Sequence, residues 1–268
     1  VKNLVVKGTG DFSADTLASV PGLSLTLDLA SVFGGSEYKV KQIDLKAPRF
    51  LFKVLKNGKV NWDVMKPSAT ADTVSTPSTF KVYLNKVSIS DMRMVYDDAE
   101  IPTMLALDGL TGTMSGDMTA DITSLDIKAV VKDITADYDG IRYMSKTTGE
   151  ITTLLNANLT TWTFTFKDGN LRLNDLNIKA DGFFAMPDNG YTMDIKFAAK
   201  ENTFKAFLSL IPAIYAKDFE NVKTSGTMAF DGFVKGLYND VSIPAFAVNL
   251  KVANGSFSYP GLPGNVSD

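Results

Sequence analysis

Residues 87–98 read VSISDMRMVYDD, and the apolar side chains in this stretch change parity midway. Two of them occupy odd positions and three then occupy even positions: Val87, Ile89, Met92, Met94 and Tyr96. Since successive side chains of a β-strand point to opposite faces, one apolar face requires one parity. One extra residue near Asp91 explains the slip. A β-bulge would supply that residue, and a short turn between two strands would give the same pattern.

The slip recurs at a fixed interval. Segments that begin at Ala129 (AVVKDITADYD) and at Leu171 (LRLNDLNIKAD) align with the first stretch, so that Asp133 and Asp175 follow Asp91 in successive steps of 42 residues. Looser copies begin at residues 43 and 250. Similarity at one period of this length predicts a stacked β-repeat. The alternative is coincidence among many short strands, whose turns use few residue types.

Strand-like alternation dominates the rest of the chain, as in GLSLTLDLA at 22–30 and LTTWTFTF at 159–166. Clusters rich in Gly, Asn and Asp separate these runs, which is typical of hairpin turns. The fold class is therefore predicted to be mostly β, a long twisted antiparallel meander with one apolar face. SADTLASV at 13–20 shows a weaker, helix-like spacing.

Two segments interrupt the alternation. Residues 66–79 are rich in Ser, Thr, Ala and Pro and predict a mobile loop. The segment 201–220 places large apolar residues three and four apart, which predicts one main helix at about 203–217. We expect one continuous domain rather than two, with an N-terminal part at 1–65, the loop at 66–79, and a main unit at 80–268 that contains the helix.

The composition restricts the function. The net charge of −3 and the pI near 5.1 argue against nucleic acid as a partner. The 268 residues contain no Cys and no His, so thiolate metal sites, disulfides and the commonest general base are absent. No apolar run is long enough for a transmembrane helix, and the start at VKNLVV suggests that an upstream anchor has been removed.

The clustered carboxylates are candidates for chemistry, but a simpler reading exists. Asp91, Asp97, Asp98 and Glu100 lie together in sequence, and such carboxylates can serve as acid and base or bind a hard cation. A solvated turn after a strand explains them better. We therefore predict no catalytic residue, no metal site and no cofactor, and we expect that the protein is not an enzyme.

Three stretches resemble the AsmA family of Gram-negative envelope proteins. FLFKVLKNGKVNWDVM (50–65) carries Asn61, Trp62 and Asp63 after a Gly turn; KVSISDMRMVYDDAE (86–100) carries Tyr96; and VANGSFSYPGLPGNVSD (252–268) carries Tyr259 and Pro260. The order of the three stretches along the chain follows the family pattern. The chain lacks the transmembrane segment with which family members begin.

The resemblance implies a bridge-type lipid transfer protein. Its sheet would be curled into a groove or half-barrel with an apolar floor, and the helix at 203–217 would pack on that floor as a lid or as core. Phospholipid or another acyl lipid would be the partner. The protein would be periplasmic and anchored to the inner membrane through its missing N-terminal segment, with a role in outer-membrane biogenesis. Patterning alone favours a closed core of two sheets, and the resemblance removes that preference.

The candidate residues of the groove are the apolar residues beside the parity slips and on the helix: Val87, Ile89, Met92, Met94, Val131, Ile134, Leu171, Leu173, Leu176, Ile178, Phe204, Phe207, Leu208 and Ile211. The alternative function is a structural scaffold of the envelope that binds protein partners. A third hypothesis, a carboxylate-based glycosidase, requires two carboxyl groups roughly 5 to 10 Å apart in a cleft.

Overall fold

The computed structural model describes residues 2–28, 38–64, 80–81, 84–118, 120–203, 206–207, 210, 223–239, 241–258 and 266–267. Within these residues the chain is mostly β-structure, as predicted. The elements are β1 (Lys2–Lys7), the 3₁₀ helix η1 (Gly10–Phe12), β2 (Thr16–Leu27), β3 (Tyr38–Lys46), β4 (Arg49–Val54), β5 (Phe80–Lys81), β6 (Lys86–Asp98), β7 (Thr103–Ser115), β8 (Ile122–Tyr138), β9 (Ile141–Asn158), β10 (Thr163–Leu173), β11 (Leu176–Ala185), β12 (Tyr191–Thr203), β13 (Lys223–Tyr238), β14 (Ala245–Ser258) and β15 (Val266–Ser267).

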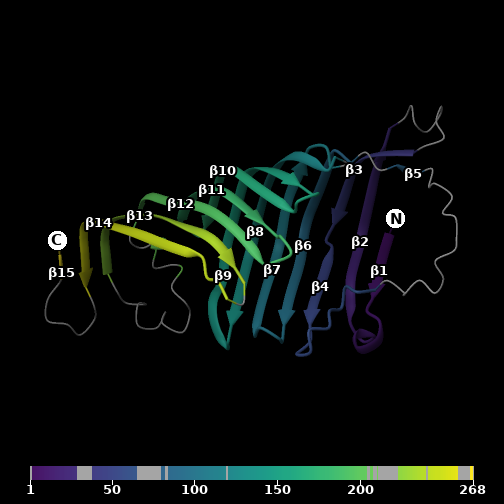
Figure 1. Ribbon diagram of the computed structural model, residues 1–268, viewed down its shortest axis with the longest axis horizontal. Coiled ribbons are helices and arrows are strands. Elements are labelled where there is room, and N and C mark those ends of the chain that lie inside the picture. The colour runs from purple at the N-terminus through teal and green to yellow at the C-terminus, as the bar shows by residue number, and fades with distance from the viewer. Residues whose placement is uncertain are drawn as a thin grey trace.

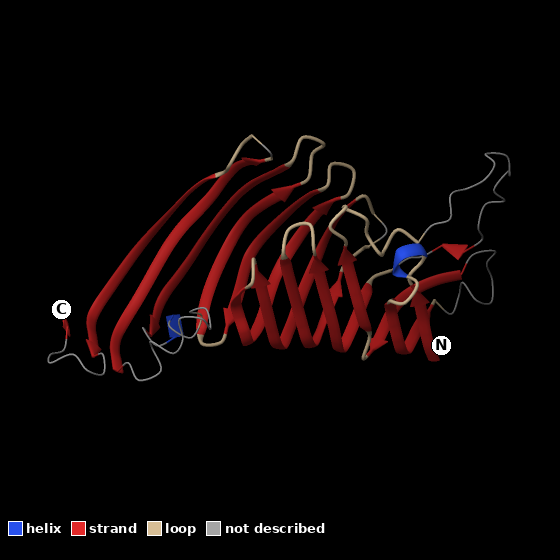
Figure 2. Cartoon of the chain, turned by 90° about the horizontal axis from the view of Figure 1, so that it is seen from below, coloured by secondary structure: helices blue, strands red, loops and turns tan. Residues whose placement is uncertain are grey.

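The described strands form one long sheet (Figure 1). From β6 to β15 each strand pairs antiparallel with the next strand in sequence, which is the predicted meander. Figure 2 shows that the sheet is twisted and that the long strands near the C-terminus curve along their length. The fold class is confirmed in its main feature, a mostly β chain in one extended sheet.

The N-terminal part of the sheet is mixed rather than antiparallel. Both β3 and β4 run parallel to β6, with Ile43 opposite Val87 and Phe52 opposite Tyr96. They lie end to end between β2 and β6, as two halves of one strand interrupted at Ala47. Two parallel strands start at the same end of the sheet, so the chain between them must cross back over the length of a strand. The segment between β4 and β6 makes this connection. Local alternation carries no information about strand direction.

The parity slip at Asp91 is a β-bulge. Ile89 pairs with Gly112 and Met92 pairs with Leu110, so two residues of β6 face one residue of β7. Asp91 has a positive φ of 53°, a left-handed conformation that Asp tolerates better than most residues. The bulge keeps the apolar residues before and after it on one face.

The slip at Asp133 is also a bulge. Val131 pairs with Gly149 and Ile134 pairs with Thr147, which leaves two residues of β8 opposite one residue of β9. The looser C-terminal copy is also a bulge: Ser225 pairs with Ser256 and Thr227 pairs with Ala253, and Asn254 in the bulge has a φ of 52°, like Asp91.

The third copy differs from the other two. Leu173 pairs with Leu176, so Asn174 and Asp175 form the two-residue turn between β10 and β11, and Asp175 is not a bulge residue. Asn174 has a φ of 51°, as a tight hairpin turn requires. Its backbone N–H donates to the carbonyl oxygen of Thr148, and its Oδ1 accepts a hydrogen bond from the Thr148 N–H. Asn174 thus extends the hydrogen-bonded pairing with β9 beyond the end of β10.

The main helix predicted at 203–217 is not confirmed. Strand β12 continues to Thr203, and only Ala206 and Phe207 are helical among the described residues of this stretch. The Thr203 hydroxyl accepts a hydrogen bond from the Ala206 N–H, as in a helix N-cap. The remaining residues of the predicted helix, including Phe204, Leu208 and Ile211, lie outside the described residues, as does the predicted loop at 66–79.

The helix-like spacing at 13–20 belongs to a strand. Val6 pairs with Ala18 and Lys7 pairs with Thr16, which makes Leu17 an extra residue of β2. Leu17 and Val20 are both buried, because this bulge places residues three apart on one face. A spacing of three is also a helical spacing, and the sequence pattern alone does not distinguish the two.

In the part of the chain that the structure describes, no helix has the length and hydropathy that spanning a bilayer requires.

Candidate functional site

One face of the sheet, here called the apolar face, carries aligned apolar residues on strand after strand. Because directly paired residues point to the same side, the register defines its members. The row that crosses the middle of the sheet consists of Ile89, Gly112, Ala129, Ile151, Leu171 and Ile178, each paired with the next. This continuity joins six strands into one apolar surface.

Ten of the predicted groove residues lie on the apolar face. They are Val87, Ile89, Met92, Met94, Val131, Ile134, Leu171, Leu173, Leu176 and Ile178. Phe207 reaches the same face, since its ring centroid lies 6.2 Å from that of Phe230 in an edge-on arrangement.

The apolar face continues through the C-terminal strands, where the sequence prediction named no strand residues. The register adds Ile195 and Phe197 of β12, Phe230 and Val234 of β13, and Phe246, Val248 and Leu250 of β14. The alternation of apolar residues in YTMDIKF (191–197) and FAVNLKV (246–252) indicates these strand residues in the sequence. The candidate list omitted these residues because it was restricted to the parity slips and the helix.

The apolar face is the more buried side of the sheet, although no second sheet covers it among the described residues. The buried apolar side chains of β6 to β13 all lie on it: Met92, Leu125, Ala157, Leu176, Ala199 and Met228. Side chains on the inner side of a curved sheet converge and shield one another, whereas those on the outer side diverge. We take the apolar face to be the inner one on this ground.

The opposite face, here called the polar face, carries the charges. Paired positions on it include Arg172 beside Glu150, Asp181 beside Lys196, and Lys251 on β14. Charged residues alternate with the apolar positions along several strands, as at Asp194 and Lys196 of β12, which is the usual division between a solvated and a shielded face.

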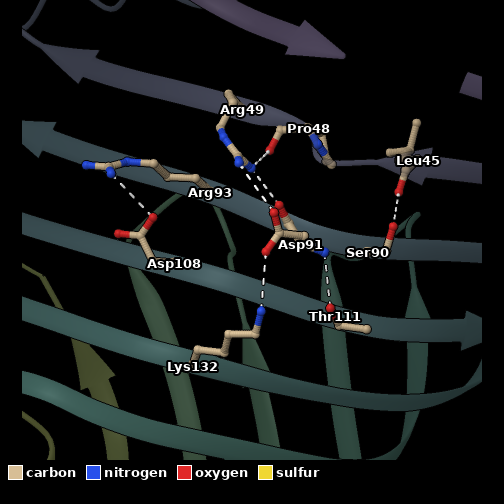
Figure 3. A network of polar contacts seen from close by, with 9 residues as sticks. All are labelled: Leu45, Pro48, Arg49, Ser90, Asp91, Arg93, Asp108, Thr111 and Lys132. Carbon is tan, nitrogen blue, oxygen red and sulfur yellow. Dashed lines mark hydrogen bonds and ion pairs between the residues drawn. The ribbon is translucent and has the colours of Figure 1, made fainter. Parts of the chain in front are cut away.

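Asp91 is the centre of a polar network on the polar face (Figure 3). The Arg49 guanidinium donates to the Asp91 carbonyl oxygen at 2.5 Å, and the Asp91 N–H donates to the Thr111 hydroxyl at 3.1 Å. Lys132 and Arg49 each approach the Asp91 carboxylate at 3.5 Å. The network crosses β4, β6, β7 and β8 at the bulges, so Asp91 binds together the strands that bend there.

Asn61 of the AsmA-like motif has a structural contact. Its side chain is almost completely buried; its Oδ1 accepts from the Lys53 N–H at 2.9 Å, and its Nδ2 donates to the Leu51 carbonyl at 2.7 Å. Trp62 packs edge-on against Phe52 of the apolar face, with ring centroids 5.9 Å apart. The motif therefore fastens the turn after β4 to the sheet. Asp63 ends this turn, and the motif residues Tyr259 and Pro260 lie outside the described residues.

Tyr96 and Asp98 form a hydrogen-bonded pair at the end of β6, in which Asp98 is buried and Tyr96 is half-buried. The Tyr96 hydroxyl donates to Asp98 at 2.6 Å, and Asp98 also accepts from the backbone N–H groups of Glu100 and Ile101. Burial tends to raise the pKa of Asp98, but the hydrogen bonds from Tyr96 and the two N–H groups outweigh it and lower that pKa. The same hydrogen bond and burial raise the pKa of Tyr96 to about 12. The carboxylate thus closes the hairpin between β6 and β7.

A second carboxylate has a similar role in the hairpin between β8 and β9. The Arg142 guanidinium donates two hydrogen bonds to Asp137, at 2.7 and 2.8 Å, and thereby lowers the pKa of the carboxyl. Among the described residues no group of three or more acidic side chains is arranged to hold a metal ion.

No protein-family model, no curated protein and no solved structure matches this chain.

Proposed function

We propose that the apolar face shields the acyl chains of phospholipid or another lipid, and that this chain is a non-enzymatic segment of an AsmA-like protein of the Gram-negative envelope. The observation that carries the proposal is the continuous apolar face, which crosses the sheet from β2 to β14 without a covering layer among the described residues. Contiguous exposed apolar surfaces that exceed the patches of ordinary soluble proteins bind lipid or another apolar partner.

The dimensions of the face suit acyl chains. Neighbouring strands lie about 4.8 Å apart, so the ten steps from β2 to β14 give roughly 50 Å measured across the strands. This exceeds the hydrocarbon core of a bilayer, about 30 Å. An entire acyl chain would therefore fit along the row that contains Ile89 and Ile178.

The proposed mechanism involves no chemical step. Burial of a methylene contributes about 0.8 kcal/mol whether the apolar surroundings are a bilayer or a protein. Transfer between the two is thus nearly neutral in free energy, and the apolar face lowers the barrier by keeping the chain out of water. Headgroups would remain in solvent at the edges, which predicts little headgroup specificity. The periplasmic location and the inner-membrane anchor follow from the same AsmA-like reading and are part of this proposal.

A matched pair of variants in β9 tests the proposal. Ile151 lies on the apolar face and Leu154 on the polar face, and their side chains are exposed to similar extents, 38% and 42%. Both positions therefore accept a charge without burying it completely. Binding of a fluorescent fatty acid and native mass spectrometry with lipid identification give the readouts, with circular dichroism as the folding control.

We expect Ile151→Asp to weaken fatty-acid binding at least about tenfold, because a carboxylate on the lipid path must be desolvated. Leu154→Asp should bind as the unmodified protein does. Equal binding by both variants, or the absence of any co-purifying lipid, contradicts the proposal.

A scaffold that binds envelope proteins is the second candidate function, and the edge of the sheet favours it. Among the described residues, β14 pairs with β15 only at Ser256 and Phe257 on its outer side. A partner could add a strand along the remaining edge. Stable protein partners in a pull-down, together with no lipid in the mass spectrum, would support this function over lipid binding.

A further inference from the structure

Four hairpins along one long edge of the sheet carry an unusual set of side chains. They connect β7 to β8 (116–121), β9 to β10 (159–162), β11 to β12 (186–190) and β13 to β14 (239–244), and are here called the hairpin rim (Figure 2). Hairpin tips normally expose small and polar residues. The rim instead exposes large apolar and aromatic side chains at or beside each tip: Ile122, Leu159, Trp162, Met186, Tyr191, Tyr238, Val241 and Ile243.

Hydrogen bonds link neighbouring hairpins of the rim into one row. The Leu159 N–H donates to the carbonyl oxygen of Asp121 at 2.7 Å, and the Met186 N–H donates to that of Trp162 at 3.1 Å. Backbone bonds of this kind fix the spacing of the tips. The exposed side chains therefore form an ordered line rather than separate loops.

The last hairpin is held in the same way. The Asn239 Nδ2 donates to the carbonyl oxygen of Asn189 at 2.9 Å, and its Oδ1 accepts from the N–H groups of Val241 and Ser242. These bonds orient the tip on which Val241 is 90% and Ile243 is 83% exposed. Two side chains of this size, held in water by a braced turn, indicate an apolar environment in the working state of the protein.

The charge of the rim restricts what that environment is. The sequences of the four hairpins contain Asp117, Asp121, Asp188 and Asp240 but neither Lys nor Arg. An anionic membrane or a nucleic acid would be repelled. Trp and Tyr, which combine an apolar ring with a polar group, are the residues enriched where hydrocarbon meets water in bilayers.

We infer that the hairpin rim docks on the interface of a zwitterionic lipid bilayer, with Val241 and Ile243 inserted beneath the headgroups and Trp162 at their level. This site is separate from the apolar face and does not depend on acyl-chain binding there. The line of tips fits a flat bilayer surface better than the compact patch through which two proteins usually associate.

The two tryptophans of the chain allow a direct test, since Trp162 lies on the rim and Trp62 lies on the turn after β4. Trp62→Phe leaves Trp162 as the only indole, and Trp162→Phe leaves Trp62. Each variant of the full chain is mixed with phosphatidylcholine vesicles whose acyl chains carry bromine, which quenches nearby indoles. We expect the fluorescence of Trp162 to fall at least about twofold, and unchanged fluorescence of Trp162 overturns the inference. Trp62, beside Phe52 of the apolar face, reports separately on acyl chains bound there.

A second pair of variants distinguishes insertion of the hairpin rim into the bilayer from non-specific adsorption of exposed apolar side chains. Val241→Ser with Ile243→Ser should lower the vesicle partition coefficient at least about tenfold, because both apolar side chains are lost. Val130→Ser with Leu154→Ser removes two apolar side chains from the polar face, 46% and 42% exposed, and should change nothing. Anionic lipid in the vesicles should weaken binding. Unchanged binding of the Val241/Ile243 variant, or binding only to a protein partner, refutes the inference.

Fatty-acid binding without vesicles distinguishes this inference from the proposed function. The Val241/Ile243 variant should bind free fatty acid as the unmodified protein does. If neither the unmodified protein nor the variant binds fatty acid, while vesicle binding still depends on Val241 and Ile243, the proposed function fails and the rim inference stands.

Discussion

Replacement of Asp91 by Val tests whether the bulge requires the residue found there. Asp91 has a φ of 53°, and its backbone is fixed on both sides by Thr111 and Arg49. Asp133 occupies the same position in the sequence repeat, but it is not among the residues with positive φ in the described part of the chain. The two positions therefore match in sequence and differ in backbone conformation.

The structure gives the size of the expected effect. A side chain with a Cβ costs roughly 1–2 kcal/mol in the left-handed region, and Asp and Asn pay less because of their local hydrogen bonds. The two exposed ion pairs of the Asp91 carboxylate, both at 3.5 Å, contribute at most about 0.5 kcal/mol each. Asp91→Val should therefore lower the free energy of unfolding by about 2 kcal/mol. Asp91→Asn should lower it by less than about 1 kcal/mol.

Urea unfolding followed by circular dichroism measures these differences, with the slope of the transition compared between variants. Asp133→Val should change the free energy of unfolding by no more than about 0.5 kcal/mol, since Val favours an extended strand. Equal losses for Asp91→Val and Asp133→Val would refute the assignment of the left-handed bulge to Asp91. A large loss for Asp91→Asn would instead show that the ion pairs dominate.

Three further predictions concern the turns and strand contacts. Asn61→Leu removes a buried amide and leaves two half-buried backbone groups of β4 without its hydrogen bonds, so it should cost about 2–4 kcal/mol in a urea unfolding experiment; a loss below about 1 kcal/mol contradicts this contact. Tyr96→Phe removes the hydroxyl that lowers the pKa of Asp98, so it should cost about 1.5–3 kcal/mol at neutral pH. The lowered pKa of Asp98 in the folded state stabilises the protein at pH values above the unfolded-state pKa, near 4. The difference in Tm between the unmodified protein and Tyr96→Phe should therefore shrink as the pH falls through the folded-state pKa of Asp98. A difference that does not vary with pH argues against an ionised Asp98. Gly182→Ala should abolish soluble expression or lower the Tm strongly, because φ is 148° there and a Cβ would collide with the carbonyl oxygen of Asp194; unchanged thermal unfolding rules out this close approach.

Much of the fold was predictable because alternation reports directly on which face a side chain occupies. The parity slips at Asp91 and Asp133 located two bulges to within one residue. The groove residues near them lie on one face for the same reason. These features depend only on residues that are close together in sequence, so they can be recognised in a single amino-acid sequence.

Where the pattern misled or left two interpretations open, different backbone geometries produce the same spacing. A bulge at Leu17 imitates a helical turn, and at Asp175 the structure has the short turn that the pattern had left open beside a bulge. Nor did the pattern reveal that Asn61, Asn174 and Asn202 bond to the backbones of neighbouring strands where regular pairing stops. Such contacts join residues that are 8 to 26 positions apart in sequence, and the alternation of side chains carries no signal of them.

Local side-chain order was enough to predict that the chain is mostly β, that it has one apolar side, and that its strands bend at recurring positions. Contacts between distant segments were needed to show that β3 and β4 run parallel to β6, that the stretch VSISDMRMVYDD is one bulged strand, and that the described strands form one sheet rather than two packed ones. Pairing direction and the covering of a face depend on where distant segments meet. The exposed line of Trp162, Val241 and Ile243 likewise emerged only when the hairpins were placed side by side.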